Sequence, residues 1–170
     1  MKKILTFLLF AFSAARMYSQ MDVPSAGGNP RATIKETVGI TDITLSYSRP
    51  DVGGREGKVW GALVTYGFST NSFITNRPTA PWRAGANENT TITFEHDVKL
   101  EGKPVPAGTY SVHMAVWPDS VLLILSKQND AWGSFYYEEK HDQLITVLKQ
   151  QMNDKSVEWL KYEFIEHKDK

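Results

Sequence analysis

Residues 110–126 read YSVHMAVWPDSVLLILS, and this stretch decides the fold. Its first half alternates, with Tyr110 and Val112 on the same side of an extended chain, which is the period of a half-buried strand. Its second half, Val121–Ser126, is continuously apolar, as expected of a strand that is covered on both faces. Between them, Trp117–Asp119 contains the proline and aspartate typical of turns. The stretch therefore predicts a β-hairpin within a larger sheet.

Period-two patterning continues on both sides of this hairpin. It begins at Thr33 and marks Ile40–Ser48, Thr90–Leu100 and Val157–Phe164 as further candidate strands. Many short strands separated by close turns predict an all-β protein, an antiparallel β-sandwich or jelly-roll-like fold with at most one short helix. Residues 143–152 fit both an amphipathic helix and a strand, and their β-rich surroundings favour the strand.

Composition limits both the architecture and the function. The chain has 170 residues, which suits a single domain with its own core. Its 19 Lys and Arg balance 19 Asp and Glu, so it lacks the basic surplus expected of a nucleic-acid-binding protein. No cysteine is present, which excludes disulfides, a thiol nucleophile and cysteine-ligated zinc. No cofactor motif or metal-binding spacing is found, so we expect neither a cofactor nor a metal.

The N-terminus has the pattern of an export signal. Lys2 and Lys3 precede an apolar run, Ile4–Ala15, which is too short to span a bilayer. We therefore expect a signal peptide over residues 1–20 and an exported protein, either periplasmic or secreted. Its removal takes away three of the 19 basic residues and no acidic one, which leaves a net charge of −3. No later segment is apolar enough to be an integral membrane segment.

The expected domain organisation follows from these patterns. Residues 21–32 are polar and contain several Gly and Pro residues, and we expect a flexible leader there. A single β-sandwich domain is expected over residues 33–165. Residues 166–170 are charged and form an expected frayed C-terminus.

The main candidate site is the polar segment at residues 82–90, WRAGANENT. The ring of Trp82, the guanidinium of Arg83, the amide of Asn87 and the carboxylate of Glu88 would suit the binding of a sugar or a peptide. The small residues at 84–86 suit a tight backbone path before the next strand, and Gly85 can take a positive φ there. A structural alternative remains open, in which Trp82 fills the core and Glu88 pairs with an arginine, either Arg83 or one of the two in the loop described next.

Two further candidates are weaker. The loop containing Arg49 and Arg55 includes Gly53 and Gly54, whose amides could approach an anion, although an ordinary surface loop is the simpler interpretation. His113 lies within the predicted hairpin and could bind a ligand, but a solvated or hydrogen-bonded histidine is favoured over a metal ligand.

Several motifs in a fixed order are shared with a known family. The segments are ITLSYSRP (43–50), VWGALVTYG (59–67), WRAGANENTTITF (82–94), PAGTYS (106–111) and WGSFYY (132–137). Together they resemble the domain of unknown function 2911 family, which consists of exported bacterial proteins. The resemblance implies a β-rich exported domain with no assigned activity, so it transfers no catalytic residue. Compared with shorter members, this chain has an insertion over residues 68–81.

The sequence thus favours an exported, non-enzymatic binding or interaction domain with a glycan or peptide ligand at the Trp82–Glu88 loop. The alternative is a hydrolase that acts on glycans through Glu88, with Asp51 or Glu56 as the second carboxylate. An open cleft that holds a second carboxylate near Glu88 would favour the hydrolase, and a buried Glu88 paired with one arginine would favour a structural role. The sequence does not indicate an oligomeric state.

Overall fold

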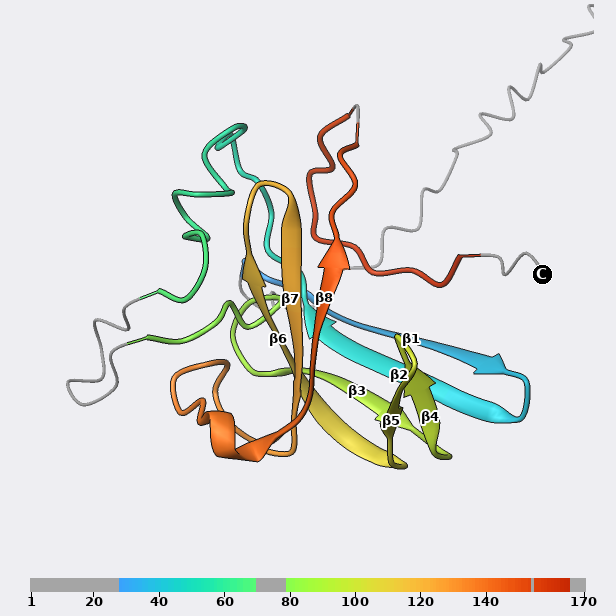
Figure 1. Ribbon diagram of the computed structural model, residues 1–170. Coiled ribbons are helices and arrows are strands. Elements are labelled where there is room, and N and C mark those ends of the chain that lie inside the picture. Colours follow the sequence, from blue (N-terminus) through green and yellow to red (C-terminus); the bar gives the residue numbers. More distant parts are fainter. Residues whose placement is uncertain (1–27, 70–78, 154, 166–170) are drawn as a thin grey trace, which may run out of the picture.

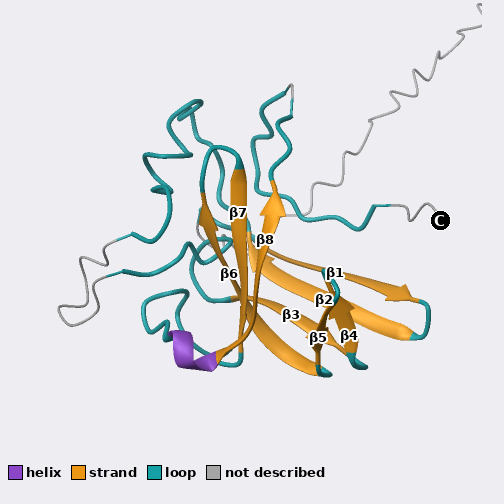
Figure 2. Cartoon of the chain, viewed as in Figure 1, coloured by secondary structure: helices purple, strands orange, loops and turns teal. Residues whose placement is uncertain are grey.

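The computed structural model describes residues 28–69, 79–153 and 155–165 (Figure 1). The expected signal peptide, most of the expected leader and the last five residues lie outside these ranges. Within them the chain is almost entirely β, as predicted (Figure 2). The elements are β1 (Arg31–Val38), β2 (Thr41–Ser48), β3 (Thr90–Phe94), β4 (Val98–Leu100), β5 (Lys103–Val105), β6 (Gly108–Val116), β7 (Ser120–Ser126), a short 3₁₀ helix (Glu139–His141) and β8 (Asp142–Lys149).

Six strands form one antiparallel sheet in the order β1-β2-β3-β6-β7-β8, and β4 pairs with β5 in a separate two-stranded sheet. The strand order follows the chain, with the β4–β5 hairpin inserted between β3 and β6. Figure 1 shows the large sheet twisting strongly, so that β8 stands steeply to β1, while β4 and β5 lie across β2 and β3. The two-layered, antiparallel, all-β architecture predicted from the period-two pattern is confirmed.

The core lies between the large sheet and the small one. Alternate residues of the central strands point into it, including Leu45 and Tyr47 from β2 and Tyr110 and Val112 from β6. From the small sheet, Val105 is buried in the same cluster. The alternation predicted from sequence is therefore the alternation of the observed core.

Strand β7 is covered on both faces, as its continuous apolar run predicts. Leu123 and Leu125 of β7 face the main core, while Ile124 between them is fully buried on the opposite face. Ile124 is paired across the hairpin with His113. The continuous apolar run of β7 thus reflects burial on both sides of the sheet.

Several predicted boundaries differ from the structure. β1 begins at Arg31, within the range expected to be leader. Thr90–Leu100 is divided into β3 and β4 by a turn that starts at Glu95. The ambiguous segment 143–152 is a strand up to Lys149, as favoured.

The C-terminal candidate strand, Val157–Phe164, is not a strand, because it makes only one isolated bridge, between Trp159 and Asp51. It is instead an extended strap that crosses the loop after β2. The backbone amide of Leu160 donates to the carbonyl of Pro50 (3.0 Å), and that of Val52 donates to the carbonyl of Glu158 (2.8 Å). Alternation therefore identified an extended segment, but no neighbouring strand is available to pair with it.

Among the described residues, no helix combines the length and the apolar character that crossing a membrane requires.

Candidate functional site

The segment from Trp82 to Asn89 is a loop that leaves the sheet and returns to it. Trp82 pairs with Met114 of β6 through two backbone hydrogen bonds of 2.8 Å, and Thr90 pairs with Val112, two residues away on the same strand. The seven residues between Trp82 and Thr90 therefore span a single two-residue step of β6. They are forced to bulge out from the sheet.

The tight path of this loop differs from the predicted one. Positive φ angles occur at Ala84 (52°) and Asn87 (58°) and not at Gly85. Gly85 is required for another reason, because a Cβ there would lie 2.7 Å from Oγ1 of Thr90 and 3.0 Å from the carbonyl oxygen of Ser48. The positive φ that a glycine permits is not used at Gly85, and the loop needs the small size of this residue instead.

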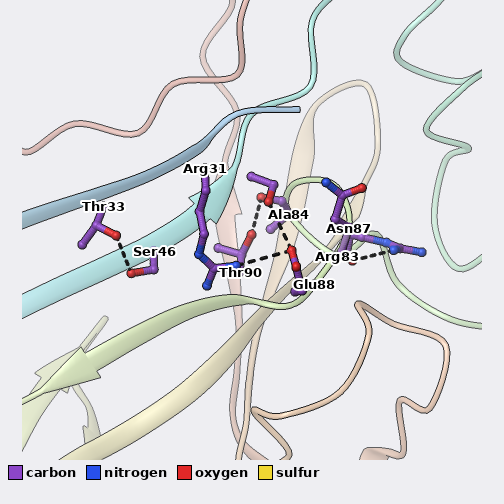
Figure 3. A network of polar contacts seen from close by, with 9 residues as sticks. Arg31, Thr33, Ser46, Arg83, Ala84, Asn87, Glu88 and Thr90 are labelled. Carbon is purple, nitrogen blue, oxygen red and sulfur yellow. Dashed lines mark hydrogen bonds and ion pairs between the residues drawn. The ribbon is translucent and has the colours of Figure 1, made fainter. Parts of the chain in front are cut away.

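The Ala84 carbonyl anchors the loop. It accepts hydrogen bonds from Oγ1 of Thr90 (3.0 Å) and from the phenol of Tyr162 in the C-terminal strap (2.8 Å). The Thr90 contact is drawn in Figure 3. Two elements that are distant in sequence therefore fix one peptide group at the centre of the loop.

Trp82 and Arg83 serve the structure of the loop and do not form an open site. The indole of Trp82 donates to the carbonyl of Gly85 (3.2 Å) and packs edge-on against Trp60. The guanidinium of Arg83 donates to the carbonyl of Asn87 (2.7 Å) and lies 4.5 Å from the ring centroid of Phe135. Burial lowers the pKa of Arg83 below its ordinary value.

Glu88 points to the opposite side of the loop from Arg83 (Figure 3). Its Oε2 lies 3.4 Å from Nη1 of Arg31 and 3.5 Å from the hydroxyl of Ser48. The expected partners, Arg49, Arg55 and Arg83, are all engaged elsewhere, so the prediction of the partner is wrong. The true partner comes from β1, which pairs with β2 so that Arg31 stands opposite Ser48.

The arginines of the loop after β2 do not reach this group. Nε of Arg49 donates to the carbonyl of Leu160 in the strap (2.9 Å). Arg55 forms an ion pair with Asp51 (3.2 Å) and donates to the carbonyl of Val52 (2.7 Å). Arg55 holds its own loop together, whereas Arg49 fastens the loop to the strap, so both arginines have structural roles.

His113 is buried and hydrogen-bonded, as favoured over a metal ligand. Its two ring nitrogens lie 2.9 Å from the hydroxyl of Ser111 and 2.8 Å from that of Ser134. Burial, with a smaller contribution from the positive charge of Arg83, lowers its pKa to about 4. Only 2% of His113 is exposed, so a ligand cannot contact it directly. Among the described residues, no group of three or more acidic or histidine side chains could hold a metal ion.

An open hollow of about 310 Å³ lies beside Glu88. Of the seven residues predicted for the site, only Glu88 lines it. The remaining lining residues come from β1, the site loop, β3 and the loop after β7: Arg31, Asn89, Thr91, Asn129, Asp130, Ala131 and Trp132.

The comparison with known families identifies the domain type. The model of the family described as a protein of unknown function (DUF2911) matches residues 29–170. The chain belongs to the DUF2911 family. The resemblance noted in its motifs is thereby confirmed. No curated protein and no solved structure matches the chain.

The hollow of this DUF2911 domain combines an exposed ring with polar groups of several kinds. Trp132 is 50% exposed on its wall. Asn89 is almost fully buried, and its Oδ1 has no hydrogen-bond partner among the described residues, while its Nδ2 donates to the carbonyl of Gln128 (3.2 Å). Two carboxylates, from Glu88 and Asp130, and one guanidinium complete the charged groups.

Sequence reasoning missed most of these residues for identifiable reasons. Arg31 falls within the range expected to be leader, and Asn129 and Asp130 belong to none of the motifs selected as candidate sites. Trp132 belongs to the family motif at residues 132–137, to which no site role is attached. One signal in the sequence could have indicated this site. A polar turn follows the buried strand β7, and a tryptophan comes two residues after Asp130.

A second hollow, of about 780 Å³, is lined by apolar and acidic side chains that include Leu122, Tyr137 and Glu139. Phe68 and Thr79 also line it, close to either end of residues 70–78, which lie outside the described ranges.

The contacts of Glu88 predict a small structural effect for the variant Glu88→Gln. About half of the side chain of each partner in the Arg31–Glu88 pair is exposed, and exposed pairs contribute no more than about 1 kcal/mol. Glu88→Gln should therefore lower the free energy of unfolding, measured by urea denaturation, by less than about 1 kcal/mol. A loss well above this would mean that Glu88 carries structural contacts beyond those to Arg31 and Ser48.

Proposed function

We propose that this DUF2911 domain is exported and binds a carbohydrate, without transforming it, in the hollow beside Glu88. The observation that carries the proposal is the half-exposed ring of Trp132 on the wall of a hollow that is otherwise polar. Exposed indole rings stack against the apolar faces of sugar rings, and the surrounding amides and carboxylates hydrogen-bond to sugar hydroxyls. The hollow thus offers a partner both for the apolar face of a sugar ring and for its hydroxyl groups.

The charges of the hollow narrow the class of sugar. Glu88 and Asp130 contribute two negative charges, and Arg31 contributes one positive charge that Glu88 already partly neutralises. A ligand with its own carboxylates would meet net repulsion. The hollow therefore favours neutral sugars over uronic acids. A peptide is less well matched, since the hollow presents only one large apolar surface.

Export is supported by the N-terminal pattern, in which Lys2 and Lys3 precede the apolar run Ile4–Ala15. These residues lie outside the described ranges. An exported protein meets polysaccharides of cell surfaces and surroundings, which fits a carbohydrate ligand.

The hydrolase is the second candidate, because one open hollow holds two carboxylates, Glu88 and Asp130. The second carboxylate is thus Asp130 and not Asp51, which pairs with Arg55. About half of the Glu88 side chain is exposed, whereas the general acid of a glycosidase lies in a desolvated, apolar setting. Binding without hydrolysis is therefore the better match. Incubation of the protein with soluble neutral oligosaccharides, followed by chromatography for shorter products, distinguishes the hydrolase from the binding domain.

Trp132→Ala should abolish most carbohydrate binding while leaving the fold intact. The side chain is half exposed, so its removal costs little stability, but stacking accounts for the apolar part of the contact. We expect affinity for cellulose, N-acetylated chitin or soluble neutral glucans, measured by retention in affinity gels, to fall by about tenfold or more.

The matched control is Trp117→Ala, which removes another exposed tryptophan (37%) that does not line the hollow. It should bind as the unchanged protein does. Equal losses in both variants, or failure of the unchanged protein to be retained by any of these polysaccharides, would contradict the proposed function.

A further inference from the structure

The face of the large sheet that points away from the core carries an ordered array of hydroxyl groups. The strand registers place residues of β1, β2, β3 and β6 in two rows across the sheet. Seven of the eight positions are serine or threonine. The first row is Thr33, Ser46, Thr91 and Ser111, and the second is Lys35, Thr44, Thr93 and Thr109.

Thr33, Lys35 and Thr109 are exposed and Ser111 is buried. The other four, Thr44, Ser46, Thr91 and Thr93, are partly exposed and so partly accessible. Alternation places them opposite the core residues of the same strands. Neighbouring hydroxyls already contact one another, since Thr33 and Ser46 lie 2.9 Å apart, as do Thr93 and Thr109. Each such pair keeps one donor and three acceptor positions free, because a hydroxyl has one donor and two acceptors. We call the six accessible side chains the hydroxyl face: Thr33, Thr44, Ser46, Thr91, Thr93 and Thr109.

The hydroxyl face is continuous with the hollow at three places. Thr91 belongs to both. Arg31, on the wall of the hollow, lies two residues before Thr33 on the same side of β1 (Figure 3). Asn129, from another wall, donates through Nδ2 to the carbonyl of Thr109 (2.6 Å).

The second sheet does not cover this face. Val98 and Val105 of β4 and β5 pack into the core, on the other side of the large sheet. Neighbouring strands are about 4.8 Å apart, so the four strands present a surface roughly 14 Å wide beside the hollow.

We propose that the hydroxyl face extends the hollow as a row of additional sugar-binding subsites, so that the ligand is a neutral polysaccharide chain and not a single terminal sugar. The inference rests on the proposed function and specifies its ligand. Serine and threonine hydroxyls donate and accept, as sugar hydroxyls do, so they can bind successive units of a chain. The face offers no large apolar ring, which a protein partner would normally engage.

Chain length provides the test. Binding of cello-oligosaccharides and N-acetylated chito-oligosaccharides, from the monosaccharide to the octasaccharide, is measured by isothermal titration calorimetry with the full exported protein. Affinity should rise by about tenfold or more between the single sugar and the longest chains, because added units gain hydrogen bonds on the hydroxyl face. Oligogalacturonates of the same lengths should bind more weakly.

Isosteric variants test whether the gain in affinity with chain length comes from the hydroxyl face. Thr44→Val and Thr93→Val remove a hydroxyl while keeping a β-branched side chain of nearly equal size, which strands accept. Each should lower affinity for the octasaccharide by about threefold or more and leave binding of the short sugars unchanged. Ile145→Val, on the distant strand β8, is the control and should change neither the affinity for the octasaccharide nor the binding of the short sugars.

The outcomes separate this inference from the proposed function. Binding that needs Trp132 but does not strengthen with chain length would overturn the polysaccharide inference and leave the proposed function standing. Undiminished octasaccharide affinity in the double variant Thr44→Val/Thr93→Val would do the same. No binding of any of these sugars by the unchanged protein would overturn both.

Discussion

Replacing Tyr162 by alanine is expected to lower the free energy of unfolding by about 3 kcal/mol, although the residue lies outside every strand. The strap that carries Tyr162 packs against the core, where its ring meets Tyr47 edge-on with centroids 4.8 Å apart. Removing a large packed ring leaves a cavity and also loses this aromatic contact.

Two hydrogen bonds tie the same residue to the sheet and to the site loop. Its backbone amide donates to the phenol oxygen of Tyr47 (3.1 Å), and its own phenol donates to the carbonyl of Ala84 (2.8 Å). Burial raises the pKa of the Tyr162 phenol, so the group remains a hydrogen-bond donor throughout the physiological range. Tyr162 thus connects the C-terminal strap to the loop that presents Glu88.

A second variant separates packing from hydrogen bonding. Tyr162→Phe keeps the ring and removes only the contact to Ala84, so it should cost about 1 kcal/mol. Tyr136→Ala, which truncates a tyrosine that is 54% exposed, is the control and should cost much less. Urea denaturation measures all three. A loss for Tyr162→Ala no larger than that for Tyr136→Ala would show that the strap does not support the fold.

The strap also illustrates where sequence reasoning succeeds and where it stops. Alternation in Val157–Phe164 predicted a strand, and the structure has instead an extended strap whose Leu160 and Tyr162 pack against the core. Whether such a chain becomes a strand depends on a partner edge, and the strap meets the irregular loop after β2 instead. Periodicity indicates whether a side chain faces the core or the solvent. It does not indicate whether a neighbouring strand is present to pair with the backbone.

The same distinction explains the candidate site. Glu88 could be selected from its local sequence, because a carboxylate in a polar loop beside a strand is a local feature. Its partner Arg31 could not, since Arg31 lies 57 residues before Glu88 in the sequence and reaches it only through the register of β1 on β2. Asp130 and Trp132, from the loop after β7, likewise lie beside Glu88 only because of the strand topology. The pattern of residues within a strand was predictable, whereas the contacts between strands required the topology.

His113 is a case in which the local pattern was ambiguous. It falls on the face of β6 opposite Val112, which in a sheet with one solvated face would be exposed. The face is in fact covered, and Ser134, in the segment after β7, supplies one of its two hydrogen bonds. Phe135 and Tyr137 follow in the same segment, and Tyr137 lies edge-on to the imidazole at 5.3 Å. A buried neutral histidine in these surroundings makes stability depend on pH.

Acidification is therefore expected to destabilise the protein through His113. The pKa of its imidazole is lowered from 6.5 to about 4 in the folded state. Between these pH values the imidazole is protonated in the unfolded chain but not in the folded chain. The free energy of unfolding therefore falls as the pH is lowered through this window, and above the window this imidazole causes no loss of stability. The contribution of this group should amount to about 2 kcal/mol between pH 7 and pH 5.

The measurement compares free energies of unfolding for the unchanged protein and for His113→Gln across this range. Glutamine does not titrate, so the variant should lose less stability than the unchanged protein on acidification, by the amount given above. Carboxylates contribute to both curves alike and cancel in the difference, including Asp142, whose pKa is raised by burial and which accepts a hydrogen bond from Tyr137. His96→Gln, at an exposed position, should retain the full dependence. Parallel curves for the unchanged protein and His113→Gln would mean that the imidazole is protonated within the fold, and that its two serine contacts tolerate the charge.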